Sequence, residues 1–200
     1  MFYEPRSGHP LRHDPFKAIV APRPIGWISS VSPQGVVNLA PYSFFTAVSG
    51  RPPMVIFASE GFKDSISNVE ATREFVVNLA TRPLAERMNE TSRAHDPAID
   101  EFGPAGLTPV ASTLVKPPRV AESPAALECR VTQMVPLVDL SGDAGDRLMA
   151  IGEVVGVHID EAFLTNGMFD MVAARTIARC GYRDYAEVTG LFQMARPDDR

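Results

Sequence analysis

The chain has 200 residues, of which 45% are apolar, and a formal net charge of −5. This is enough apolar material to bury the core of one domain, and the negative charge gives no support for binding to nucleic acid or to an anionic membrane. Eighteen prolines divide the chain into short elements, which favours a β-rich domain over a helical bundle.

The first fifteen residues are polar and proline-rich, and we predict an extended arm there, followed by one domain over residues 16–195. His9 and His13 have the spacing of a metal site on a helix, but Pro10 and Pro15 disfavour that helix. The N-terminus lacks the pattern of a secretory signal, so we expect a cytoplasmic protein. We expect no metal site.

Residues 21–59 form the most informative stretch, because no charged residue occurs between Ile25 and Gly50. Its prolines and glycines exclude a membrane helix. The pattern instead predicts, in order, a strand over 25–31, a turn over 32–35, a strand over 36–40, a helical turn over 42–48 and a buried strand over 53–59. Such an uncharged, polar stretch suits a ligand held by hydroxyl, amide and backbone groups.

Helices and strands then alternate less regularly. We predict helices over 64–73, with Asp64 as N-cap, and over 83–91, strands over 74–80, 125–138 and 148–159, and a long loop over 92–124. Gly152 and Gly156 in the last strand predict bulges. Cys129 is expected to be a buried strand thiol. About six mostly hairpin-connected strands favour an antiparallel barrel, closed or nearly so.

The familiar motifs for nucleotide hydrolysis, zinc proteolysis and serine hydrolysis are absent from the sequence. Asn38 and Ser43, in NLAPYS, flank a bend. Their side chains either form hydrogen bonds to the polar edge of a flat heterocycle or simply cap the bend and the helix predicted after it. Lys63 and Ser65 begin a helix whose free N–H groups suit a phosphate, although these residues taken by themselves favour an ordinary capped surface helix.

Trp27 lies either in the core or beside a ring system, and strand alternation predicts that only one of Trp27 and Ile28 faces inward. His95, in the long loop, and His158, at a strand end, are weak catalytic candidates. Asp139 and the aspartates of residues 143–146 have the character of a solvated turn.

The ordered blocks PRPIGWISSVSPQGVVNLAPYSFF, RPPMVIFAS, KDS..N and EFVVNLA resemble the flavin reductase-like FMN-binding split-barrel family. The later GEVVGVHID and RCGYRDY resemble its flavoredoxin-like branch. The resemblance covers roughly residues 15–195. It implies a mainly β fold with peripheral helices, a six-stranded antiparallel Greek-key split β-barrel, and a homodimer with FMN in a groove near the dimer interface.

The resemblance also implies the cofactor contacts. Trp27, Ser29 and Ser30 are expected along the ribityl chain and ring, and Asn38, Ala40 and Ser43 at the ring edge. Ser59, Lys63, Ser65 and, less directly, Asn68 are expected at the phosphate. Arg179 and Tyr185 are expected to contact the flavin from the second subunit.

The implied function is an FMN-dependent oxidoreductase, with an NAD(P)H:flavin reductase as the first hypothesis. Because the flavin performs the redox chemistry, no dedicated catalytic side chain is required. The alternative is a flavoredoxin-type electron carrier that a protein partner reduces, and a weaker third possibility is a barrel that binds another ligand such as haem.

Overall fold

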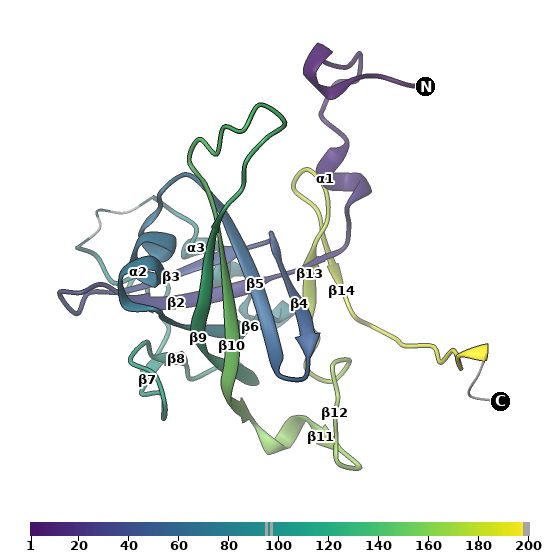
Figure 1. Cartoon of the computed structure of the whole chain (residues 1–200). Helices are drawn as coiled ribbons and strands as arrows, with labels where there is room; N and C mark the ends of the chain where they lie inside the picture. The colour runs from purple at the N-terminus through teal and green to yellow at the C-terminus, as the bar shows by residue number, and fades with distance from the viewer. Residues whose placement is uncertain (95, 97, 198–200) are drawn as a thin grey trace.

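A computed structural model describes residues 1–94, 96 and 98–197 (Figure 1). Its centre is an antiparallel sheet of seven strands in the order β3-β2-β6-β9-β10-β5-β4. These strands are β2 (Gly26–Val31), β3 (Val37–Tyr42), β4 (Phe45–Gly50), β5 (Pro53–Glu60), β6 (Glu74–Leu79), β9 (Ala125–Pro136) and β10 (Arg147–Ile159).

Short elements surround this sheet. The helices are η1 (Pro5–Ser7), α1 (Phe16–Ile19), α2 (Asp64–Thr72), η2 (Arg82–Leu84), α3 (Ala85–Glu90) and η3 (Glu161–Phe163). A three-stranded sheet joins β1 (Arg23–Pro24), β13 (Ile177–Arg179) and β14 (Tyr185–Glu187). Two small hairpins pair β7 (Pro109–Val110) with β8 (Arg119–Val120) and β11 (Leu164–Thr165) with β12 (Met168–Phe169).

The predicted mainly β architecture is confirmed, but the sheet has seven strands and not six. The extra strand is β4, where the prediction of a helical turn over residues 42–48 is wrong. The backbone bends at residues 43–44, and β4 then pairs with β5, with Phe45 opposite Phe57. Pairing with a neighbouring strand therefore overrides the short helical pattern. Among the described residues, no ladder joins the edge strands β3 and β4, so a closed barrel is not formed by backbone pairing.

Both faces of β2 are buried, which corrects the prediction that only one of Trp27 and Ile28 faces inward. Both side chains have no exposed surface. Trp27 packs in a cluster with Leu39 and residues of α3 and the long loop, whereas Ile28 packs with Phe57 and other residues of the opposite cluster. The alternation rule assumes one solvated face, but α3 and the loop cover the second face of this strand.

Three further predictions are confirmed in the long strands. Cys129 of β9 is fully buried. The register between β9 and β10 shifts at Ile151/Gly152 and again between Val154 and Gly156, as the two glycines predicted. A Cβ at position 152 would lie 2.5 Å from Phe75 Cζ, so the glycine is needed for this close packing.

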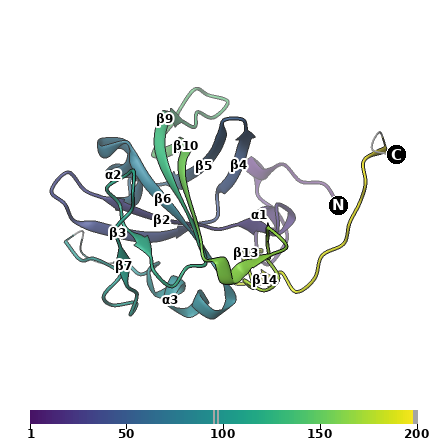
Figure 2. The same ribbon diagram turned by 90° about the horizontal axis from the view of Figure 1, so that it is seen from below.

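A segment near the N-terminus and a segment of the C-terminal region pack together beside the main sheet. In both views α1 lies next to β13 and β14 (Figures 1 and 2), and a Cβ at Gly181 would lie 2.3 Å from Ala18 Cβ. The guanidinium of Arg23 donates to the carbonyl groups of Lys17, Val20 and Cys180. The arm thus ends in a short helix fixed against the C-terminal strands. None of the described helices is long and apolar enough to cross a membrane.

Candidate functional site

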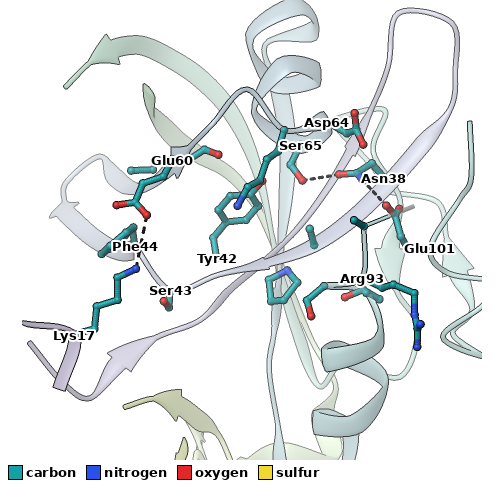
Figure 3. A pocket seen from close by; sticks show the side chains of 18 residues that line it. Lys17, Asn38, Tyr42, Ser43, Phe44, Glu60, Asp64, Ser65, Arg93 and Glu101 are labelled. Carbon is teal, nitrogen blue, oxygen red and sulfur yellow. Dashed lines mark hydrogen bonds and ion pairs between the residues drawn. The ribbon is translucent and has the colours of Figure 1, made fainter. Parts of the chain in front are cut away.

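A cavity of about 600 Å³ opens where β3, the end of β5 and the start of α2 meet (Figure 3). Six of the residues predicted to contact a ligand line it together. They come from separate parts of the chain and are Asn38, Ala40, Ser43, Ser59, Lys63 and Ser65. The bend after β3 and the first turn of α2 therefore line the same cavity.

A chain of hydrogen bonds fixes one wall of this cavity. Glu101 Oε1 accepts from Asn38 Nδ2 at 2.7 Å, and Glu101 Oε2 accepts from the N–H of Leu39 at 2.9 Å. Asn38 Oδ1 in turn accepts from the hydroxyl of Ser65 at 2.5 Å (Figure 3). Because both functional groups of the Asn38 amide are engaged, its orientation is set before any ligand enters.

Glu101 is a functional candidate that sequence reasoning missed. It lies in the long loop, in a segment without periodicity, so nothing local marked it among the acids of residues 96–101. The residue is 6% exposed and lines the cavity. Burial raises the pKa of Glu101, although the N–H of Leu39 and the amide of Asn38 oppose this shift.

Tyr42 stands in the centre of the cavity wall, close to Ser65 (Figure 3). Burial raises the pKa of its phenol, and hydrogen bonding to Ser65 and Ser59 partly offsets the rise. The phenol therefore stays neutral and serves as a hydrogen-bonding group. Ser59 also donates its hydroxyl proton to the carbonyl of Gly61 at 2.7 Å, which shapes the loop before α2.

The start of α2 supplies unpaired donors. Its N-cap residue is Lys63, not the predicted Asp64, and no side chain caps the helix. The first N–H groups of such a helix have no intrahelical acceptor and carry a partial positive charge. Lys63 adds a full charge and has no side-chain partner among the described residues, while Asp64 places a carboxylate in the same wall.

The opposite wall contains an ion pair that the sequence did not suggest. Lys17 Nζ of α1 lies 3.7 Å from Glu60 Oε2 and 5.3 Å from the centre of the Phe44 ring (Figure 3). The segment reaches the cavity because α1 packs on the C-terminal strands. This contact between distant parts of the chain leaves no trace in local sequence patterns.

Six of the twelve predicted ligand contacts do not line the cavity, and four of these six are Trp27, Ser29, Ser30 and Asn68. Trp27 lies behind its wall and donates Nε1–H to Thr91 Oγ1 at 3.0 Å, and Ser29 donates to the carbonyl of Pro118. Asn68 donates to Ser30 Oγ at 3.2 Å and so ties α2 to β2. These side chains support the site from behind.

Arg179 and Tyr185 line a second groove of about 310 Å³, which shares Pro41, Tyr42 and Ser43 with the cavity. The Arg179 guanidinium lies 4.5 Å from the centre of the Tyr185 ring. The family resemblance implied that both residues contact the flavin from a second subunit. In the structure of this single chain they adjoin the cavity of the same chain.

Of the two candidate histidines, only His158 can be placed relative to the site. His95 lies outside the described residues. His158 of β10 does not line the cavity and pairs with the buried Glu128 of β9. Glu128 also accepts the N–H groups of Thr113 and Leu114, so this pair fixes the long loop to the sheet. His9 and His13 each lie against a tyrosine ring.

Comparison with known proteins agrees with this geometry. The family model described as flavin reductase like domain matches residues 20–173. An uncharacterized protein of Aquifex aeolicus is 34% identical over 178 residues, which cover 86% of this chain and 87% of the relative.

Two solved structures are also similar. Nitrilotriacetate monooxygenase component B from Bacillus cereus is 27% identical, with a TM-score of 0.88 over 97% of this chain and 98% of that one. The 2-nitrobenzoate 2-nitroreductase of Pseudomonas fluorescens is also 27% identical, with a TM-score of 0.80 over 90% and 88% of the two chains.

Proposed function

The chain belongs to the flavin reductase-like family, and on that premise we propose that it is an FMN-dependent oxidoreductase, namely an NAD(P)H:flavin reductase. The observation that carries this proposal is the meeting of six predicted contact residues, five of them polar, around one cavity. Its volume of about 600 Å³ lies within the range of roughly 300–1,000 Å³ that is usual for cofactor-sized ligands.

The residues present fit the chemistry of FMN. Lys63 and the uncapped start of α2 would hold the phosphate, since a helix N-terminus and a cation together stabilise an anion. Asn38, Tyr42 and Ser43 would meet the ring edge with an oriented amide, a neutral phenol and a hydroxyl. Asp64 opposes the phosphate and limits the affinity.

FMN supplies hydride and electron transfer when it is bound. The protein's part is to bind and orient the ring system and to restrict water around it. The network from Glu101 through Asn38 to Ser65 keeps the donors and acceptors of the wall in place. Fixed dipoles of this kind need no reorganisation during the reaction.

The test is steady-state oxidation of NADH and of NADPH by the purified protein with added FMN. We expect turnover well above the background of free flavin. Protein that binds FMN but shows no such turnover would contradict the reductase and favour the flavoredoxin-type carrier, which the resemblance of the β13–β14 stretch RCGYRDY suggests. Protein that is red and not yellow would indicate haem.

The same resemblance leads us to propose a cytoplasmic homodimer. Exposed apolar side chains on α1 support the dimer, since Phe16 is 54% exposed and Ile19 is 74% exposed. Light scattering coupled to size exclusion measures the mass directly, and a monomer at micromolar concentration would contradict the dimer.

A further inference from the structure

A third groove continues the path that leads away from the cavity. It has a volume of about 590 Å³ and shares Met88, Asn89, Arg179 and Tyr185 with the second groove. The second groove in turn shares Pro41, Tyr42 and Ser43 with the cavity. One continuous surface therefore runs from the cavity, past β13 and β14, to the end of η2.

This third groove is rich in arginine although the chain carries a net charge of −5. Arg82, Arg179 and Arg183 line it together with one carboxylate, Glu86. Arg82 Nη1 and Glu86 Oε1 are 4.0 Å apart, and both side chains are at least half exposed, so this pair neutralises Arg82 only weakly. We name the groove lined by these three arginines the arginine groove.

The three guanidinium groups differ in how many contacts they already make within the protein. Arg183 is exposed and has no side-chain partner among the described residues. Arg179 donates to the carbonyl of Tyr182 and lies over the Tyr185 ring, which holds it in place without neutralising it. The nearby carboxylate of Glu187 is already engaged by Arg175 Nε at 2.7 Å.

Guanidinium groups bind phosphate oxygens through planar, paired N–H donors. Three arginines against one carboxylate leave a net charge of about +2, which matches the two negative charges of a pyrophosphate. A ligand that joins a pyrophosphate to a reactive ring could therefore place its charge here while the ring reaches the cavity. Nicotinamide dinucleotides have this constitution.

We propose that the arginine groove binds the pyrophosphate of the nicotinamide dinucleotide that reduces the flavin. This inference rests on the proposed reductase function, and it specifies where that co-substrate lies. The pyrophosphate lies outside the reacting rings, so its contacts strengthen binding without entering the chemical step. Loss of an arginine should then raise KM and leave kcat nearly unchanged.

The experiment uses the FMN-loaded protein and the variants Arg183→Ala and Arg82→Ala. Arg51→Ala is the matched control, because Arg51 is exposed, has no side-chain partner among the described residues and lines none of the three grooves. ADP binding is measured by calorimetry, and KM and kcat are measured for NADH and NADPH. The affinities for FMN and riboflavin are measured in parallel, with thermal melting as a check on folding.

We expect ADP to bind the wild-type protein and to compete with NADH. Each groove variant should weaken ADP and raise KM by about five- to tenfold, the scale of one charge-assisted hydrogen bond discounted for exposure. The control should match the wild type. Added salt should raise KM of the wild type more than KM of Arg183→Ala. Salt screens the contact between Arg183 and the pyrophosphate, and the variant has already lost that contact.

Three results would overturn the inference. They are failure of ADP to bind at millimolar concentration, equal behaviour of Arg183→Ala and Arg51→Ala, and a selective loss of FMN over riboflavin affinity in Arg183→Ala. The last result would mean that the groove holds the flavin phosphate. A different result would separate the two proposals. If ADP binding depends on Arg183 but the protein oxidises neither NADH nor NADPH, the reductase function is refuted and the arginine groove is still a nucleotide-binding site.

Discussion

Removal of the Lys63 side chain should weaken FMN binding much more than riboflavin binding. Riboflavin has the same ring and ribityl chain but no phosphate, so the difference isolates the contact at the start of α2. One charge-assisted hydrogen bond contributes about 1–3 kcal/mol. Because Lys63 is exposed, the lower part of that range applies, about 1–2 kcal/mol, or a loss of about 5- to 30-fold in FMN affinity.

Quenching of flavin fluorescence on titration measures both dissociation constants. Lys116→Ala is the matched control, because Lys116 is exposed and does not line the cavity. Equal losses for FMN and riboflavin would mean that Lys63 supports the fold of the site and does not contact the phosphate. Unchanged FMN affinity would place the phosphate elsewhere on the protein.

Three further changes test other parts of the structure. Asp64→Asn should tighten FMN binding severalfold without affecting riboflavin, because it removes a carboxylate from the wall that holds the phosphate. Glu128→Gln should lower the free energy of unfolding at neutral pH by about 1–3 kcal/mol and flatten its decline in acid, as measured by denaturant titration at several pH values. Gly181→Ala should destabilise the protein by about 1–3 kcal/mol, because its Cβ would lie 2.6 Å from the Cα of Ala18; unchanged melting would contradict the close packing of α1.

The acid dependence expected for Glu128 follows from the sign of its pKa shift. Burial alone would raise this pKa, but the N–H groups of Thr113 and Leu114 and the His158 ring outweigh burial, and the pKa lies below the ordinary value of 4.5. Stability from this carboxylate is therefore complete above about pH 4.5. It is lost as the pH falls from that value through the lowered pKa of the folded state.

Local patterns predicted the parts of the site that are built from short, continuous segments. The strand that contains Asn38 and the helix after Lys63 follow from residue type and spacing, and the fold joins them at one cavity. Glu101 and Lys17 could not be found in this way. Each enters the site through packing between segments far apart in the chain, and neither segment has a periodic pattern.

The errors have equally specific causes. Strand alternation predicted that only one of Trp27 and Ile28 faces inward, but α3 and the long loop cover the second face and bury Trp27 as well. The helical turn over residues 42–48 failed because β5 offers Phe45 and Thr46 a backbone partner. In both cases a neighbour supplied by the tertiary structure decides the outcome, and the local sequence does not identify that neighbour.

The distribution of charge along the grooves links the two binding proposals. Lys63 lies at one end of the path and the arginine groove at the other, and the stretch that the cavity and the second groove share includes the uncharged Pro41, Tyr42 and Ser43. A flavin phosphate at the first end and a dinucleotide pyrophosphate at the other would bring both uncharged rings together over these three residues. Variants at the two ends should then act separately, with Lys63→Ala weakening FMN alone and Arg183→Ala weakening the dinucleotide alone, and their effects should add in the double variant.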